Sequence, residues 1–189
     1  MKFDESVIVF DTETTGLTPE SDEILQLSII NGKGKVLFNK YFKPEHKTSW
    51  ERAESIHGIS PKKVRFKKRF SYYKDTIQSI FENADTIIAY NGKFDIKFLE
   101  AAGIDCFKMS KEQPELFSES EVPPRAKDYR DPMIVFADIY GEYSEKLHSN
   151  KFKKLIDAAN YYGYSFDAHD SLEDVKATLF IAKKIYGED

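Results

Sequence analysis

Four acidic residues and one histidine, spread over most of this chain, have side chains that could bind metal ions and move a proton. They are Asp11, Glu13, Asp95, Asp174 and His169. Each acid stands where a strand is expected to stop or a helix to begin, so one end of one sheet could gather them. Clustered carboxylates repel one another unless cations lie among them, and their oxygens suit Mg²⁺ or Mn²⁺. Two such ions side by side are the usual apparatus for splitting a phosphodiester.

The first two acids follow a run of apolar residues. Residues 6–10 are expected to form a central strand, because positions 7–10 are apolar on both faces. Side chains alternate along a strand, so Asp11 and Glu13 project to the same side if the extended geometry persists. A charged turn would explain one acid at a strand end. A pair directly after a buried strand favours a shared metal.

His169 precedes Asp174 by five residues where the last helix is expected to begin. This spacing leaves His169 on the less regular segment before the helix, while Asp174 faces inward from its first turns. A histidine there could take a proton from water, since its reference pKa of ~6.5 is close to neutral. Taken alone, His169 is better explained as a surface or capping residue. Asp170 and Glu173 are alternative ligands, although Asp170 fits better as the helix N-cap.

The strands that must position these residues can be predicted from apolar runs and turns. Residues 23–31 and 35–42 are joined by a glycine-rich turn at 32–34, so the first three strands should form an antiparallel meander. A further buried strand at 86–90 leads into a helix that carries Asp95. Gly103 then stands in the position that ends a helix.

The remaining elements are expected to be helices and one long loop. Apolar residues at helical spacing predict helices at 50–56, 70–81, 133–140, 152–159 and 172–186. Residues 104–130 lack periodicity and contain three prolines, which predicts a surface loop around a short strand.

Bulk properties limit the class of protein. At 189 residues the chain is predicted to be a single domain spanning residues 1–189. No apolar run approaches the ~20 residues needed to cross a membrane, and no export signal is visible, so we expect a cytoplasmic protein without a membrane partner. The net charge of −4 equals the charge of the four candidate acids, so it does not exclude a polyanionic substrate.

A basic run lies between positions 62 and 69. Its members are Lys62, Lys63, Arg65, Lys67, Lys68 and Arg69. The first interpretation is a solvated turn before a helix. The functional alternative is a track for the phosphates of an incoming strand.

Several segments resemble the motifs of the DEDDh branch of the DnaQ-like 3'-to-5' exonucleases. They are DTETTGL at 11–17, HGI at 57–59, AYNGKFDIKFL at 89–99 and HDSLEDVKAT at 169–178. The resemblance extends over most of the chain, from about residue 7 to 186. Members of this family include proofreading subunits of bacterial DNA polymerases and stand-alone nucleases.

The resemblance implies a ribonuclease H-like α/β fold, in which three antiparallel strands are extended by parallel strands, with helices on both faces. It also implies hydrolysis of the 3'-terminal phosphodiester of DNA with two divalent cations, Mg²⁺ or Mn²⁺, releasing nucleoside 5'-monophosphates. Asp11 would bridge both ions, Glu13 and Asp174 would complete the site that holds the nucleophilic water, and Asp95 would support the second ion. His169 would be the general base.

The same resemblance bears on the mechanism and on the substrate pocket. A sister branch has a tyrosine four residues before the last aspartate, and Asp170 in that position excludes the tyrosine mechanism. The residues expected to receive the terminal nucleotide are Thr14, Thr15, Gly16, Leu17, His57, Asn91 and Phe94. Leu17 would pack against a base, although simple core packing is the alternative for Leu17 and Phe94.

The expected substrate is therefore a single-stranded or frayed 3' end of DNA, and a DNA polymerase is a candidate partner in replication or repair. Two alternatives stay open. One is an RNA-trimming exoribonuclease or oligonucleotide hydrolase with the same chemistry. The other, of a different class, is a non-catalytic polymerase-associated module that binds nucleic acid, against which the intact metal and base positions argue.

Overall fold

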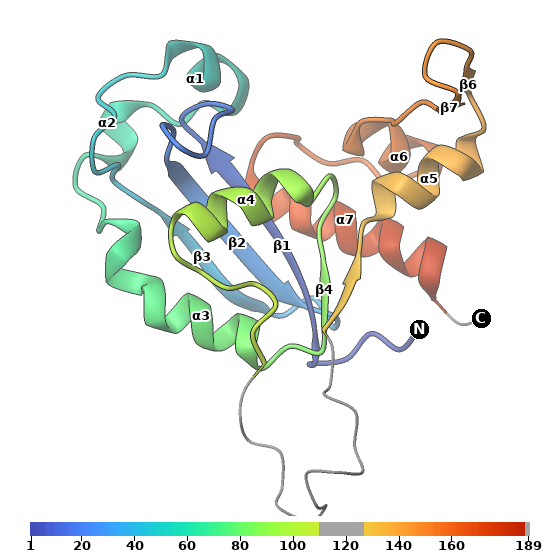
Figure 1. The fold of residues 1–189 in the computed structure, drawn as a ribbon, viewed down its shortest axis with the longest axis horizontal. Helices are drawn as coiled ribbons and strands as arrows, with labels where there is room; N and C mark the ends of the chain where they lie inside the picture. The colour runs from blue at the N-terminus through green and yellow to red at the C-terminus, as the bar shows by residue number, and fades with distance from the viewer. Residues whose placement is uncertain (110–126, 188–189) are drawn as a thin grey trace, which may run out of the picture.

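A five-stranded sheet in the order β3-β2-β1-β4-β5 is the centre of the computed structural model, which describes residues 1–109 and 127–187 (Figure 1). The strands β1 (Val7–Thr14), β2 (Ile24–Asn31) and β3 (Val36–Tyr41) form an antiparallel meander. The strands β4 (Thr86–Ile88) and β5 (Asp128–Arg130) extend it in parallel with β1. The predicted mixed sheet is therefore confirmed.

Side chains of β1 alternate between two faces, and one face packs against α3 (Lys74–Glu82) and α4 (Lys93–Ala101). Ile8 and Phe10 lie in this layer, and the rings of Phe10 and Phe81 meet edge to face with centroids 5.1 Å apart. Figure 1 shows α4 crossing in front of the sheet. This layer supplies the larger part of the buried aromatic core.

The opposite face of the sheet packs against the longest helix, α7 (Ser171–Tyr186). Val7 and Val9 of β1 share a buried cluster with Val175 and Leu179 of α7. Helices therefore cover both faces of the sheet, as predicted. Because α7 runs along β1, the end of that strand lies beside the start of the helix.

Shorter elements surround this framework. They are α1 (Glu51–His57), α2 (Pro61–Val64), the 3-10 helix η1 (Phe70–Tyr73), α5 (Pro132–Tyr140), the hairpin β6 (Tyr143–Ser144) and β7 (Ser149–Asn150), and α6 (Leu155–Tyr161). The β6–β7 hairpin was not predicted, since its strands are two residues each. No helix in the described ranges is long and apolar enough to cross a bilayer.

The structure corrects several predicted boundaries. The first strand continues past residue 10 to Thr14, because its last residues stay paired with β2. The strand predicted at 86–90 ends at Ile88, where its pairing with the three-residue β5 stops. The short strand expected within 104–130 is β5, and residues 110–126 lie outside the described part of the chain.

Two predicted helices also begin differently. The helix expected from residue 70 starts as a 3-10 turn, in which residues three apart lie on one side. Phe70 and Tyr73 use this to pack against Phe42, with centroids 5.1 and 6.0 Å away. Phe152 was expected in a helix, but α6 begins at Leu155 and the Phe152 side chain is 63% exposed.

We expect Phe81→Ala to lower the free energy of unfolding by about 3–5 kcal/mol, because it removes a fully buried ring from the main core. Urea denaturation followed by circular dichroism would measure it. Phe152→Ala deletes the same side chain at an exposed position and should change stability by no more than about 0.5 kcal/mol. Equal losses in the two variants would contradict this description of the core.

Candidate active site

The predicted acids meet where β1 ends and α7 begins. Asp11 and Glu13 continue the alternation of β1 on the face covered by α7, so both project toward Asp174. One carboxylate oxygen each of Glu13 and Asp174 and one ring nitrogen of His169 lie within 4.8 Å of one another. Glu13 thus shares one small volume with two residues that follow it by more than 150 positions of sequence. Such a group can hold a metal ion.

The start of α7 sets the direction of Asp174. Asp170 is the N-cap, as predicted, and its carboxylate accepts a hydrogen bond of 3.0 Å from the Leu172 amide. His169 has a positive φ of 75°, which few residues other than glycine adopt. Its backbone amide donates to Asp174 at 3.3 Å, while its side chain is exposed. The chain therefore bends back so that the imidazole and the carboxylate face the same space.

The sheet holds this helix start in place. Asp170 accepts hydrogen bonds from the Tyr41 hydroxyl of β3 at 3.1 Å and from the Gln26 amide of β2 at 3.4 Å. Beside them, the buried hydroxyls of Ser28 and Ser171 lie 2.6 Å apart. Sequence reasoning missed all three contacts, because each joins residues more than 120 positions apart. They fix His169 and Asp174 relative to β1.

Asp95 reaches the site from the first turn of α4. It is buried, and its Oδ1 accepts hydrogen bonds from the Thr12 amide at 2.9 Å and hydroxyl at 2.6 Å. The loop before α4 is held by Asp131, which accepts from the amides of Asn91 at 3.0 Å and Gly92 at 3.2 Å. A Cβ atom at Gly92 would lie 2.6 Å from the Ala89 Cβ and 2.8 Å from the Tyr129 hydroxyl, so this turn requires glycine. The two hydrogen bonds with Thr12 thus hold Asp95 against β1.

Burial and mutual repulsion hold the site carboxyls partly protonated in the absence of cations. Burial raises the pKa of Glu13 to about 9 and the pKa values of Asp95 and Asp174 to about 7. Burial, then Asp95 and Asp174, raise the pKa of Asp11 well above its usual range. The Oδ2 atom of Asp11 is buried without a hydrogen-bond partner. No lysine or arginine of the described residues forms an ion pair with these acids.

A pocket of about 460 Å³ opens beside the acids and contains six of the seven residues predicted to receive a nucleotide. They are Thr14, Thr15, Gly16, Leu17, His57 and Phe94. Asn91 does not line this pocket. Its backbone amide donates a hydrogen bond to Asp131 instead. Ile56, which was not predicted, also lines the pocket and is 56% exposed. It lines the same pocket as Leu17, which is 74% exposed, so the pocket has two exposed aliphatic side chains.

The side chains of Thr14 and His57 form hydrogen bonds within the wall of this pocket. The Thr14 hydroxyl donates to the Gly16 carbonyl at 2.6 Å, so it shapes the loop. His57 Nδ1 accepts from the Ile59 amide at 3.0 Å, which leaves the ring proton on Nε2 to donate to the Thr14 carbonyl at 3.1 Å. Burial lowers the pKa of His57, which favours this neutral form. His57 therefore supports the wall as a neutral side chain.

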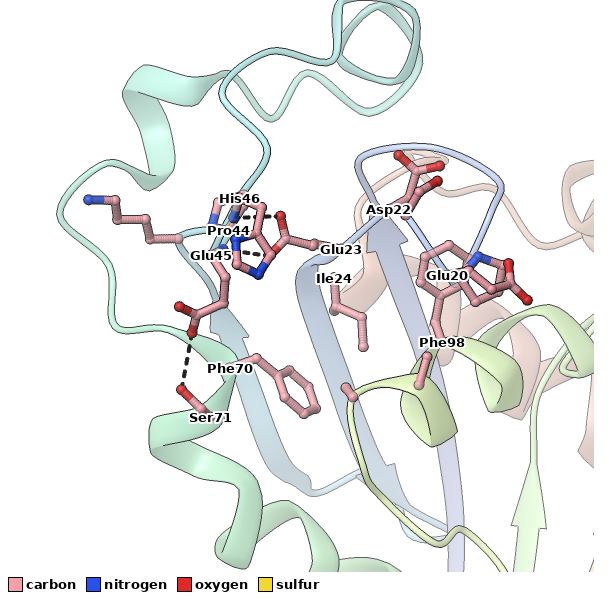
Figure 2. A pocket seen from close by; sticks show the side chains of 15 residues that line it. Glu20, Asp22, Glu23, Ile24, Pro44, Glu45, His46, Phe70, Ser71 and Phe98 are labelled. Carbon is pink, nitrogen blue, oxygen red and sulfur yellow. Dashed lines mark hydrogen bonds between the residues drawn. The ribbon is translucent and has the colours of Figure 1, made fainter.

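A second hollow, of about 330 Å³, lies beside the loop after β1 and has several acids on its rim (Figure 2). Glu23 accepts from the amides of His46 at 3.0 Å and Lys47 at 2.8 Å, and Glu45 pairs with Arg69 at 2.6 Å. Figure 2 shows Glu23 turned toward His46 and Glu45 turned toward Ser71, whose hydroxyl donates to Glu45 at 3.2 Å. They are thus engaged in holding loops, whereas Asp11 at the end of β1 has a buried oxygen without a hydrogen-bond partner.

Comparison with known proteins agrees with this geometry. Residues 8–182 match the family model RNase_T, described as Exonuclease. The chain belongs to the exonuclease family. This confirms the predicted resemblance to DnaQ-like exonucleases, whereas its assignment to the DEDDh branch stays a prediction.

A subunit of one bacterial DNA polymerase III and a second DNA polymerase III of another type are similar to this chain over part of their length. The chain is 39% identical over 98 residues to the DNA polymerase III subunit epsilon of Rickettsia typhi, covering 49% of this chain and 42% of that protein. It is 30% identical over 99 residues to the PolC-type DNA polymerase III of Thermotoga maritima, covering 51% of this chain and 7% of that protein. The chain thus matches less than half the length of these relatives.

Solved structures show the same fold. Exonuclease I of E. coli in complex with a dT13 oligonucleotide covers 95% of this chain, and this chain covers 40% of it, with a TM-score of 0.70 and 23% sequence identity. An Exonuclease I structure concerned with processivity matches with a TM-score of 0.69, 23% identity, and coverage of 95% and 41% of the two chains. The predicted ribonuclease H-like architecture is therefore confirmed.

The raised carboxyl pKa values predict that the metal-free exonuclease loses stability as pH rises. Protonated carboxyls fit the cluster better than charged ones. Their contribution is complete below about pH 4, where the same groups titrate in an unfolded chain. It is lost progressively as pH rises from there to about 7 for Asp95 and Asp174 and to about 9 for Glu13. Urea denaturation in chelator between pH 5.5 and 9 would measure this slope.

Asp174→Asn should flatten the slope, because the amide does not titrate, and Mn²⁺ should restore the stability of the wild-type protein at high pH. Glu100→Gln, at an exposed position outside the cluster, is the matched control and should leave the slope unchanged. A wild-type stability that is flat over this range would contradict the description of the carboxylate cluster.

Proposed function

We propose that this chain is a single exonuclease domain that hydrolyses the 3'-terminal phosphodiester of DNA and releases nucleoside 5'-monophosphates. The observation that carries the proposal is the meeting of Asp11, Glu13, Asp95 and Asp174 with His169 at one end of β1. Membership of the exonuclease family supports the reaction class. The names of the polymerase III relatives support DNA as the substrate and a DNA polymerase as a partner.

The four acids fit divalent cations. Their raised pKa values and the unpartnered Oδ2 of Asp11 are what a cation site shows before it is neutralised. We assign Asp11, Glu13, Asp95 and Asp174 as the residues that would hold two Mg²⁺ or Mn²⁺ ions. When bound, such ions would lower the pKa of a coordinated water and would compensate the negative charge that develops on the phosphate oxygens.

His169 is proposed as the general base. Its exposed imidazole lies within 4.8 Å of Glu13 and Asp174, so it can take the proton of the attacking water next to the scissile phosphate. The strained backbone of His169 and the capping contacts of Asp170 reduce the freedom of the ring. The absence of tyrosine at position 170 agrees with histidine in this role.

The pocket beside the acids is proposed to receive the terminal nucleotide. Leu17 and Ile56 offer exposed aliphatic surface to the faces of a base, and Phe94 closes the pocket on the side of α4. His57, held as a neutral donor to the Thr14 carbonyl, keeps this wall in place. Leu17 and Ile56 would thus contact the base itself. The pocket therefore favours an unpaired end over a duplex end.

We expect hydrolysis of single-stranded DNA to require Mg²⁺ or Mn²⁺ and to stop in excess chelator, because the uncompensated acids repel phosphate. Asp11→Ala and Asp174→Ala should each abolish turnover while the circular dichroism spectrum stays unchanged. Product analysis should show nucleoside 5'-monophosphates released from a 3'-labelled strand. Undiminished hydrolysis in chelator, or a near-wild-type rate in either variant, would refute the ligand assignment.

His169→Ala should lower kcat by roughly 10²–10⁴-fold, since removal of a general base costs about this much. Metal affinity and strand affinity should change little, which separates proton transfer from binding. Normal turnover of the variant would make His169 a structural residue at a helix start.

A further inference from the structure

The segment from Lys62 to Tyr72 presents basic and aromatic side chains in turn on the surface. Phe66 is 84% exposed and Tyr72 is 67% exposed, which is unusual for large rings. The guanidinium of Arg65 lies 4.2 Å from the centroid of Phe66, and the ammonium of Lys68 lies 4.9 Å from that of Tyr72. Each exposed ring is therefore accompanied by a cation. We call residues 62–72 the basic ridge.

Most charges of the basic ridge are available to a ligand. Arg69 pairs with Glu45 at 2.6 Å. Within residues 1–109 and 127–187, the other members of the run form no ion pair; they are Lys62, Lys63, Arg65, Lys67 and Lys68. These uncompensated cations stand out in a chain whose net charge is −4. A solvated turn explains the charges, but it does not explain the two exposed rings placed among them.

The basic ridge begins next to the candidate active site. The ammonium of Lys63 lies 4.2 Å from the centroid of Tyr41, and the Tyr41 hydroxyl donates to Asp170 beside His169. Val64 anchors the start of the ridge in a buried cluster with Leu25. In Figure 1 the chain then descends from α2 to α3 along the outer edge of β3, away from the end of the sheet where β1 stops.

A single-stranded polynucleotide matches this surface. It alternates planar bases with phosphates, and proteins bind such strands by stacking bases on aromatic rings and pairing phosphates with lysine and arginine. An acidic peptide would satisfy the cations, but it would leave the two exposed rings without a planar partner. The order of features along the ridge therefore favours nucleic acid.

We propose that the basic ridge binds the part of a single strand that lies upstream of its 3'-terminal nucleotide. Phe66 and Tyr72 stack on bases, and Arg65 and Lys68 contact phosphates. This inference rests on the proposed function, which places the scissile phosphate next to His169, the neighbour of Asp170. It gives the enzyme a substrate class, a single-stranded tail several nucleotides long, that the terminal pocket alone does not define.

The test compares a dinucleotide with a single strand of about 20 nucleotides, longer than one binding segment. For the long strand, Phe66→Ala should raise KM roughly tenfold, because stacking on one ring is lost. The double variant Arg65→Gln, Lys68→Gln should raise KM by a similar factor and reduce its salt dependence. The kcat values and the hydrolysis of the dinucleotide should not change, and Phe66→Tyr should restore long-strand binding.

Matched controls lie far from the ridge. Phe152→Ala removes another exposed ring, and the double variant Lys183→Gln, Lys184→Gln removes two exposed charges from α7. Neither should alter KM for the long strand. Unchanged KM and salt dependence in the ridge variants would overturn the inference, as would equal losses in the controls. Loss of affinity for polyglutamate without loss for DNA would overturn it in favour of an acidic peptide.

A binding measurement separates this inference from the proposed function. Fluorescence anisotropy of the labelled long strand, in an Asp11→Ala background, reports binding without turnover. If the wild-type protein hydrolyses neither substrate, the proposed function fails, and a weakened anisotropy signal in the ridge variants still supports the ridge. If the wild-type protein is active and the ridge variants bind like the background protein, the ridge alone is refuted.

Discussion

Four carboxylates crowded at one end of β1 repel one another, and much of the surrounding structure serves to hold them together. Asp11 and Glu13 are fixed by a strand in the middle of the sheet, which cannot move without breaking pairs on both sides. Asp95 is tied to Thr12 by two hydrogen bonds. Burial then prevents water from screening the charges, so the cluster is neutral only when protons or cations bind to it. The crowding of the four carboxylates thus accounts both for the rigid surroundings of the site and for the site's affinity for cations.

The longest helix, α7, carries the remaining acid, and contacts with distant parts of the chain fix both of its ends. At its start, Asp170 is bound by Tyr41 and Gln26. At its end, the Tyr186 carbonyl accepts a hydrogen bond of 2.7 Å from the N-terminal ammonium of Met1. Repulsion between Asp174 and the acids of β1 therefore cannot be relieved by sliding the helix. This repulsion between the carboxylates therefore favours the binding of a cation among them.

The sequence allowed the antiparallel meander, its extension by parallel strands and the Asp170 cap to be predicted, because turns, alternation and capping are local rules. Glu13 projects as expected once β1 is seen to continue through Thr14. The contacts of Tyr41 and Gln26 with Asp170 could not be predicted, since they depend on how β2 and β3 meet a helix more than 120 residues later. The turn at Gly92 and the role of Ile56 likewise depend on neighbours that only the folded chain brings together.

The net charge of −4 combines two regions of opposite sign that would act on a strand in succession. As proposed, the basic ridge would attract phosphates whether or not cations are bound, and that attraction would weaken with salt. The acids of the site reject phosphate until cations compensate them. A strand could therefore bind the ridge without metal, whereas its hydrolysis at the site would require metal. Lys63, close to Tyr41 and hence to Asp170, lies where these two regions meet.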